Sequence, residues 1–467
     1  MPKDEDTQKI RAPIISVLGH IDHGKTSILD FIRGSVVQKH EAAGITQHIG
    51  ASFLPIEDIV DFCNVSEEMA KRLVIPGLLV VDTPGHAAFV NLRKRGGAVA
   101  NIAILVIEAM AGPEPITWES IRILRERKVP FIIAANKIDK VPGWKSKEGI
   151  RFFRQAIKNQ EEYTKKELDN VIYKLMADFT SEGFKMVDRF DKIKNFTENI
   201  AIVPTSAITG EGIPDLMLVL IGLIQQFLKG NIAYSDGPAK GVVLEVKGTQ
   251  GLGTTIDTII YDGYINKDDM IVVGTLDEPI VTKIKALLQP KPMDEIRDPR
   301  YKFNSCDRVY ASAGIKIAAQ NLDGVIAGAP FRVVRDDAEK EEVVEQIRRE
   351  MGEIAIEVED EGVVLKADSI GSLEAIVKLF SENGVPIRRA DVGNVTKKDI
   401  VDAATSQITN PSLSVVLGFN VKIYDEAMVE AEREGIRIFT NNVIYKLMEE
   451  YIEYREKREE EEKLTIL

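Results

Sequence analysis

GHIDHGKT, residues 19–26, decides the fold expected for this chain. It matches the pattern GxxxxGK[ST] and stands between an apolar run at 12–18 and a segment of helical character. Glycines in such a loop let backbone N–H groups wrap a phosphate, and the N-terminus of the following helix favours the negative charge. Lys25 is placed to pair with the terminal phosphates, and the Thr26 hydroxyl to bind Mg²⁺. The stretch predicts a nucleotide site but does not name the base.

Further short apolar runs follow this loop, at 78–81, 102–107, 131–135 and 201–203. Runs of this length are typical of strands that are buried on both faces of a parallel sheet. Segments with helical character lie between them, such as 115–127. The alternation predicts a doubly wound α/β domain over residues 8–228.

The motif DTPG, residues 82–85, ends the second of these predicted strands. A carboxylate at a strand end that faces the phosphate loop suits a second-shell ligand of Mg²⁺, which is the role predicted for Asp82. Gly85 would let its backbone N–H approach the γ-phosphate. Alone the motif is also an ordinary turn, and its spacing after the phosphate loop is what favours the functional interpretation.

The motif NKID, residues 136–139, names the base. The Asp139 carboxylate accepts two hydrogen bonds from guanine, through N1–H and the exocyclic amine, and adenine offers no such pair of donors. The segment Thr205-Ser206-Ala207 fits the last base-contacting loop, after the strand at 201–203. Four motifs in this order, each at a strand end, predict a guanine-nucleotide site and disfavour a P-loop ATPase. The predicted nucleotide-binding residues are Gly19, His20, Ile21, Asp22, His23, Gly24, Lys25, Thr26, Ser27, Asp82, Gly85, Asn136, Lys137, Asp139, Ser206, Ala207 and Ile208.

Two residues between and after these motifs suit hydrolysis. Thr46, in the segment 41–46, is placed to close on Mg²⁺ and the γ-phosphate, which gives a switch that loosens on hydrolysis. His86 follows Gly85 directly, where a side chain orients the attacking water in related switch proteins. The five histidines all fall within the first 86 residues, and we expect them in loops around the phosphates rather than in a metal site.

The residue pattern changes twice in the remainder of the chain. Short β-rich pieces between 229 and 344 predict a small antiparallel barrel. The sequence GTQGLG, residues 248–253, imitates a cofactor loop but lies in this β-rich region, so a barrel turn is the better interpretation. Residues 345–440 again alternate and predict a smaller α/β domain, and 441–467 predict a connecting helix whose first turns pack on that domain.

Composition sets outer limits. The chain has 467 residues, a net charge of −13 and two distant cysteines, Cys63 and Cys306, which favour neither a disulfide framework nor a zinc site. The acidic balance argues against broad nonspecific binding of nucleic acid, although a local basic patch stays open. The N-terminus lacks an apolar signal region and no run of about 18 apolar residues occurs, so we expect a cytoplasmic protein without membrane contact.

These motifs resemble those of the translational GTPases. The resemblance rests on residues 19–26, on GITQHIGA at 44–51 and on DTPGH at 82–86. The sequence at 41–51 and the long charged segment 141–200 are similar to initiation factor five B, the archaeal and eukaryotic relative of bacterial initiation factor two. The resemblance covers nearly the whole chain.

The resemblance implies a function. Proteins of this family bind GTP with Mg²⁺, promote joining of the ribosomal subunits, help to place initiator tRNA, and hydrolyse GTP to GDP when the ribosome aligns the site. By resemblance His86 positions water, Ile21 and Ile45 form the apolar pair that flanks it, and Asp22 binds a monovalent cation, Na⁺ or K⁺. The implied partners are the ribosome and its RNA, initiator tRNA and other initiation factors, and we expect a monomer in solution.

The resemblance has one departure. The family carries a further β-barrel beyond the connecting helix, which holds the aminoacyl end of the initiator tRNA, and this sequence stops at Leu467. We therefore expect a truncated form and no direct hold on the tRNA. Two alternatives stay open at this point: another translational GTPase, of the elongation or tRNA-delivery type, and a GTP-dependent binding switch with little hydrolysis.

Overall fold

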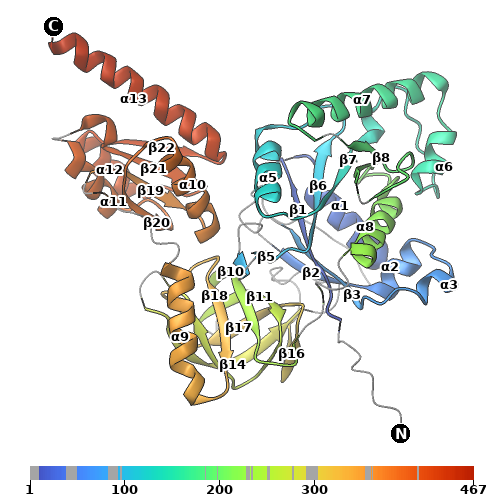
Figure 1. Cartoon of the computed structure of the whole chain (residues 1–467), viewed down its shortest axis with the longest axis horizontal. Helices are drawn as coiled ribbons and strands as arrows, with labels where there is room; N and C mark the ends of the chain where they lie inside the picture. The colour runs from blue at the N-terminus through green and yellow to red at the C-terminus, as the bar shows by residue number, and fades with distance from the viewer. Residues whose placement is uncertain are drawn as a thin grey trace. The chain divides into compact units, whose positions relative to one another are not determined.

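The structure, a computed structural model, describes most of the chain (Figure 1). The described residues are 10–20, 22–37, 50–82, 93–94, 97–184, 186–196, 198–227, 232, 235–249, 253–275, 278–290, 303–352, 359, 361–407 and 410–466.

The first part is a sheet of seven strands. In order across the sheet these are β2 (Gly50–Pro55), β3 (Gly77–Asp82), β1 (Ile14–Gly19), β6 (Ile102–Glu108), β7 (Phe131–Asn136), β9 (Ile200–Pro204) and β8 (Val187–Arg189). Only the edge pair β2–β3 is antiparallel, and the other pairs are parallel. Every residue of β1 and β3 is buried, as strands covered on both faces must be. The predicted doubly wound α/β domain is confirmed.

Helices cover this sheet (Figure 1). They are α1 (Lys25–Val37), α2 (Ile56–Phe62), α3 (Glu67–Ala70), α5 (Pro115–Glu126), the 3₁₀ turn η1 (Ile138–Lys140), α6 (Phe153–Lys158), α7 (Glu162–Ser181) and α8 (Ile213–Phe227). The rings of Phe31 and Phe62 join α1 to α2, and those of Trp118 and Phe179 join α5 to α7. The two-residue strands β4 (Arg93–Lys94) and β5 (Gly97–Ala98) pair with each other. The charged segment 141–200 folds as α6, α7 and β8, and β8 extends the sheet beyond β9, which the sequence had not indicated.

The second part is a closed antiparallel barrel. Its strands are β13 (Met270–Val273), β18 (Pro330–Val334), β10 (Lys240–Thr249), β11 (Gly253–Asp262), β17 (Ala313–Ala319) and β14 (Ile280–Gln289), and the pairing of β13 with β14 closes the ring. The short strand β15 (Asn304–Cys306) pairs with β14, and β12 (Tyr264–Asn266) with β16 (Arg308–Tyr310). The predicted barrel is confirmed. The neighbouring strands β10 and β11 end at Thr249 and begin at Gly253, and residues 250–252 of the predicted turn lie outside the described residues.

A helix that the sequence analysis did not anticipate follows the barrel. It is α9 (Asp337–Gly352), and it crosses the boundary expected at 344/345. Ile347 packs with Val272 and Val334, and Arg332 forms an ion pair with Glu350. These contacts fasten α9 to β18.

The last part is a three-layer α/β domain. Its parallel sheet has the order β20 (Ile387–Val392), β19 (Val363–Ala367), β21 (Val415–Phe419) and β22 (Arg437–Asn441). One core cluster joins this sheet to α10 (Ile370–Glu382) and α13 (Ile444–Ile466), and another joins it to α11 (Lys397–Ala404) and α12 (Asp425–Glu434). The short 3₁₀ turns η3 (Thr405–Gln407) and η4 (Pro411–Leu413) follow α11. Asp399 accepts a hydrogen bond from the Thr396 backbone N–H at 2.8 Å, which forms a capping box at the start of α11.

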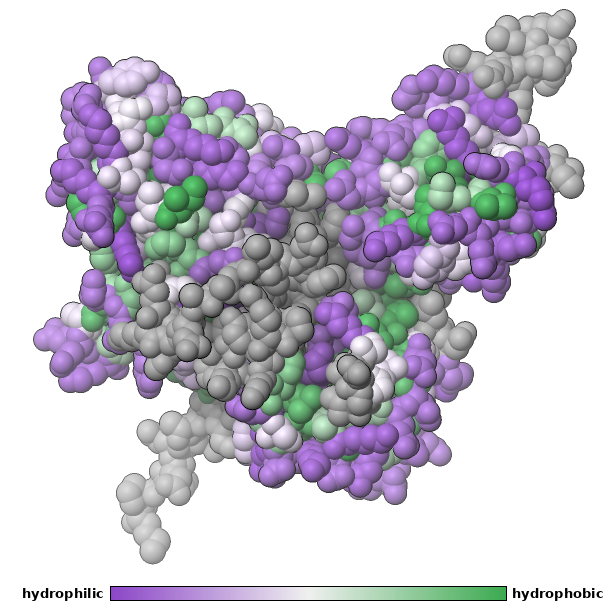
Figure 2. Space-filling view, turned by 180° about the vertical axis from the view of Figure 1, so that it is seen from behind, coloured by the Kyte–Doolittle hydropathy of each residue, from purple (hydrophilic) through white to green (hydrophobic). Residues whose placement is uncertain are grey.

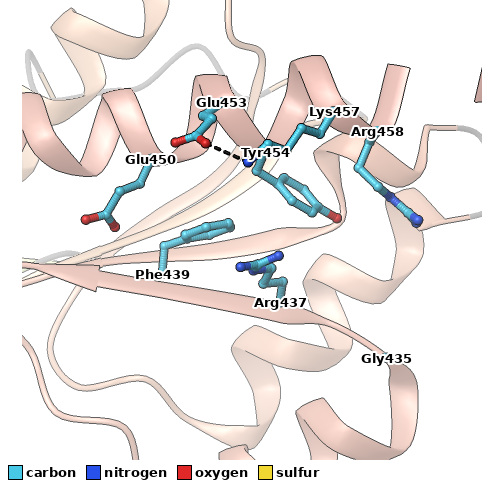
Figure 3. A pocket seen from close by; sticks show the side chains of 8 residues that line it. All are labelled: Gly435, Arg437, Phe439, Glu450, Glu453, Tyr454, Lys457 and Arg458. Carbon is cyan, nitrogen blue, oxygen red and sulfur yellow. Dashed lines mark hydrogen bonds and ion pairs between the residues drawn. The ribbon is translucent and has the colours of Figure 1, made fainter. Parts of the chain in front are cut away.

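The connecting helix α13 packs on this domain through its first turns, as predicted. Leu447 and Tyr451 are fully buried there. Further along, the Arg437 guanidinium lies over the rings of Phe439 and Tyr454, 5.0 and 5.3 Å from their centroids (Figure 3). These residues line a polar groove of about 580 Å³ between α13 and β22. The backbone of α13 then stays helical to Ile466.

One face of the protein is mainly polar. On the face shown in Figure 2, hydrophilic residues cover most of the described surface and hydrophobic ones form small patches between them. Among the described helices, none combines the length and the apolar character that a membrane span needs.

Candidate nucleotide-binding site

The phosphate loop joins β1 to α1. Gly19, at the end of β1, has φ +141°, and a Cβ there would stand 2.1 Å from the carbonyl oxygen of Val106. Gly24 has φ +93°, and a Cβ there would stand 2.3 Å from Nδ2 of Asn136. Both positions therefore need glycine, for backbone conformation and for space.

The Lys25 side chain binds the backbone of its own loop. Its Nζ donates to the carbonyl oxygens of Gly19 at 2.7 Å and His20 at 2.8 Å. Burial lowers the pKa of Lys25 to about 8, although the carboxylates of Asp82 and Asp22 act in the opposite direction. A bound polyphosphate would add negative charge beside this ammonium group and so raise the pKa of Lys25 again.

Asp82 reaches the loop from the neighbouring strand. It ends β3, which pairs with β1 so that Asp82 lies opposite Val17. The Thr26 hydroxyl donates to Oδ2 of Asp82 at 3.3 Å. Burial raises the pKa of Asp82, and the cations of Arg33 and Lys25 oppose that rise. A hydroxyl and a carboxylate at this separation are the hard oxygen donors that suit Mg²⁺.

Asn136 connects the phosphate loop to the base loops. It ends β7, and its Nδ2 donates to the His23 carbonyl oxygen at 2.9 Å. Its Oδ1 accepts from the Ala207 backbone N–H at 3.1 Å. One buried amide thus fixes the distance between the two loops.

Asp139 and Ser206 face each other across the base loops. Asp139 lies in the turn η1, which the left-handed Lys137 (φ +65°) introduces. The Ser206 hydroxyl donates to Oδ1 of Asp139 at 2.5 Å and itself accepts from the backbone N–H of Ile208 at 3.3 Å. The structure therefore brings together residues 67 positions apart that the sequence analysis had grouped by motif alone.

Two acidic residues at this site had not been predicted. Glu108, at the end of β6, accepts from Lys137 at 2.5 Å and from Lys140 at 2.9 Å. Burial alone would raise the pKa of Glu108, but these two hydrogen bonds outweigh it and lower the pKa. Its place at a strand end was the only signal that the sequence offered.

Glu114 is the second. Its carboxylate lies 2.9 Å from Nε2 of His20 and 3.3 Å from Nε2 of His23, both in the phosphate loop. Burial lowers the pKa of His23, and the hydrogen bond to Glu114 opposes that shift. No motif covers Glu114 in the sequence.

Some of the predicted site residues lie outside the described part of the chain. They are Ile21, Ile45, Thr46, Gly85 and His86. The described ones that carry side-chain contacts at the site are His20, His23, Lys25, Thr26, Asp82, Asn136, Lys137, Asp139 and Ser206.

Comparison with known families agrees with this geometry. The family described as "Elongation factor Tu GTP binding domain" matches residues 10–226, and "Translation-initiation factor 2" matches residues 334–452. Fold and site together define a P-loop GTPase of the translational class.

Relatives of known name narrow the class further. The probable translation initiation factor IF-2 of Ignicoccus hospitalis is 50% identical to this chain. The match covers 99% of this chain and 76% of the relative. That of Aeropyrum pernix is 48% identical over 98% of this chain and 74% of its own length. The crystal structure of GDP-bound aIF5B from Aeropyrum pernix superposes with a TM-score of 0.83 at 48% identity, over 98% of this chain and 76% of that one.

The chain belongs to the translation initiation factor IF-2 family, which includes aIF5B, and is a translation-initiation GTPase. The match of residues 334–452 to an initiation-factor family removes the elongation or tRNA-delivery alternative.

Proposed function

We propose that this GTPase acts on the ribosome, where it promotes joining of the subunits and placement of initiator tRNA, and hydrolyses GTP to GDP once the ribosome has aligned its site. Its partners on this proposal are ribosomal RNA, initiator tRNA and other initiation factors, in the cytoplasm. It would act as a monomer built from a GTP-binding domain (8–228), a barrel (229–344), a small α/β domain (345–440) and a connecting helix (441–467).

The observation that carries the nucleotide part is the Asn136 bridge between the phosphate loop and the base loop. This bridge supports the proposal because it ties the loop that carries Lys25 to the segment whose Ser206 hydrogen-bonds to Asp139. We assign guanine recognition to Asp139, supported by Lys137, Ser206, Ala207 and Ile208. The phosphates would lie on the loop from Gly19 to Ser27.

The donor set supports a Mg²⁺ site. Thr26 would bind the ion directly and Asp82 would act through water, because the hydroxyl and the carboxylate lie 3.3 Å apart. Thr46 and the backbone of Gly85 would join them in the GTP state. When bound, Mg²⁺ would neutralise charge on the phosphates. Asp22 is the residue proposed for a monovalent cation, Na⁺ or K⁺; its φ of +66° places it in a tight turn of the loop.

We assign hydrolysis to His86, flanked by Ile21 and Ile45. The support for these roles is the sequence resemblance, because the three residues lie outside the described ranges. His86 would orient water only when the ribosome moves it into place, so we expect hydrolysis to be slow without the ribosome.

Subunit joining can be followed by light scattering with purified ribosomal subunits and initiation complexes. We expect the chain with GTP to accelerate joining and the chain with GDP to fail. Lys25→Ala, which removes the phosphate-binding ammonium group, should fail with either nucleotide. Equal joining rates with GTP, with GDP and without the protein would contradict the proposal.

A further inference from the structure

The carboxylate of Glu114 spans two side chains of the phosphate loop. Its Oε2 lies 2.9 Å from Nε2 of His20, and its Oε1 lies 3.3 Å from Nε2 of His23. The two imidazole rings stand side by side, with centroids 5.2 Å apart. Each oxygen of one carboxylate therefore serves one histidine.

The chemistry of this bridge is directional. An ionised carboxylate only accepts hydrogen bonds, so the His23 ring donates through Nε2–H, and the His20 ring makes the shorter contact with the same carboxylate. Glu114 keeps 39% of its side chain exposed, whereas the His23 side chain is 3% exposed. The bridge thus runs from a buried loop residue to the protein surface.

Glu114 is anchored firmly enough to hold the loop. It precedes α5 as its N-cap residue, and Pro115 follows at the first helical position. Its carbonyl oxygen accepts from the backbone N–H groups of Thr117 at 2.8 Å and Trp118 at 3.1 Å. The side chain consequently extends from a fixed backbone, at the helix end that favours a negative charge.

The described contacts hold the phosphate loop at several places, one of which is the hydrogen bond from Thr26 to Asp82. Asn136 holds the carbonyl group of His23, and Lys25 holds the carbonyl groups of Gly19 and His20. Glu114 binds the loop through the ring nitrogens of His20 and His23. A loop fixed before the ligand arrives loses less entropy on binding and opens less often afterwards.

We propose that Glu114 is a positioning residue that holds the phosphate loop in its binding shape through His20 and His23, and that it thereby slows the dissociation of guanine nucleotide. Glu114 itself does not touch the nucleotide. This inference rests on the nucleotide site proposed above and adds a control on exchange that none of its motifs provides.

The test is the dissociation rate of a fluorescent GDP analogue, chased with excess GDP. Glu114→Ala removes both bonds, and we expect the rate to rise roughly three- to tenfold, since the pair is partly exposed to water. Glu114→Gln keeps one good acceptor and should give an intermediate rate. Glu126→Ala is the matched control, because it removes an exposed acid from the other end of the same helix and should leave the rate unchanged.

Two further measurements separate positioning from general structural damage. In a His20→Ala background, Glu114→Ala should add much less than it does in the wild-type chain, because the bridge is already half removed. The urea-unfolding midpoint of Glu114→Ala should match that of wild type, because a partly exposed pair contributes little to the stability of the fold. If Glu114→Ala does not fold, Glu114→Gln carries the test alone.

Rates for Glu114→Ala and Glu114→Gln that match wild type, or additive effects in the His20→Ala background, would overturn this inference and leave the nucleotide site intact. A wild-type chain that does not bind the GDP analogue would overturn the site and the inference together.

Discussion

A single buried amide, that of Asn136, organises the nucleotide site at the scale of residues. It links the His23 carbonyl oxygen to the Ala207 backbone N–H, and so joins segments about 70 and 110 positions away in sequence. Ser206, which precedes Ala207, donates a hydrogen bond from its hydroxyl to the carboxylate of Asp139 and so connects Asp139 to this link. Its role in choosing the base can be tested directly.

Asp139→Asn should weaken GTP and favour xanthosine triphosphate. The carboxamide cannot accept both guanine donors, whereas its NH₂ group can donate to the extra oxygen of xanthine. A site built on such bonds rejects a mismatched base strongly, so we expect the affinity for GTP to fall by at least about 10²-fold. Competition binding with both nucleotides measures the change. Unchanged affinity for GTP would remove Asp139 from base recognition.

His86→Ala tests the proposed hydrolytic residue. A side chain that orients water only in the activated geometry contributes to the transition state and little to binding of the ground state. We therefore expect the affinity for GTP to stay within a few-fold and ribosome-stimulated hydrolysis to fall by roughly 10²-fold or more. Single-turnover hydrolysis on ribosomes measures this, and a variant that turns over normally would exclude His86 from the mechanism.

The site residues that belong to ordered motifs could be predicted from the sequence, and the others could not. Lys25, Thr26, Asp82 and Asp139 stand in motifs whose spacing is typical of residues that bind one ligand. Glu108 and Glu114 act on other side chains instead, and a carboxylate at a strand end or before a helix has too many ordinary explanations to be singled out.

At the scale of elements, the strands were predictable because a fully buried strand leaves a continuous apolar run, as in β1 and β6. Strand β8 was not predicted from the sequence because it has three residues and only Val187 is buried. Helix α9 was not predicted from the sequence because most of its residues are charged. In hindsight Val343, Ile347 and Met351 recur four apart, which is the signal of its buried side.

A buried carboxylate links two of the helices in the GTP-binding domain. Asp215, in the first turn of α8, accepts from the Phe153 backbone N–H at 2.7 Å, where α6 begins. Burial raises the pKa of Asp215 from 3.8 to about 6, although the hydrogen bond from Phe153 acts against the rise. Between these two values the folded chain binds more protons than the unfolded chain, so its stability falls as the pH rises.

Asp215→Asn should remove this dependence while it keeps an acceptor for Phe153. We expect the stability of the variant relative to wild type to increase by about 1 kcal/mol between pH 5 and 7.5. Urea unfolding followed by tryptophan fluorescence measures it, since Trp118 and Trp144 both lie in the GTP-binding domain. Asp188→Asn, on the edge strand β8, is the control and should show no such change. A relative stability of the Asp215→Asn variant that is independent of pH would contradict the assignment.

At the scale of the whole molecule, all the nucleotide motifs lie within residues 19–208, and the barrel and the small α/β domain follow them. The family assignment makes this chain an initiation GTPase, and the central proposal is that its hydrolysis depends on a second body, the ribosome. Such dependence could be expected only from resemblance, because an activator outside the chain leaves no spacing or packing signal within it.

The most direct test is multiple-turnover GTP hydrolysis by the purified chain, with and without assembled ribosomes. The account predicts slow turnover by the protein alone and stimulation by roughly 10²-fold or more when ribosomes are added, in the range that external activators of GTPases provide. Lys25→Ala should abolish the stimulated rate. Equal rates with and without ribosomes would contradict the account.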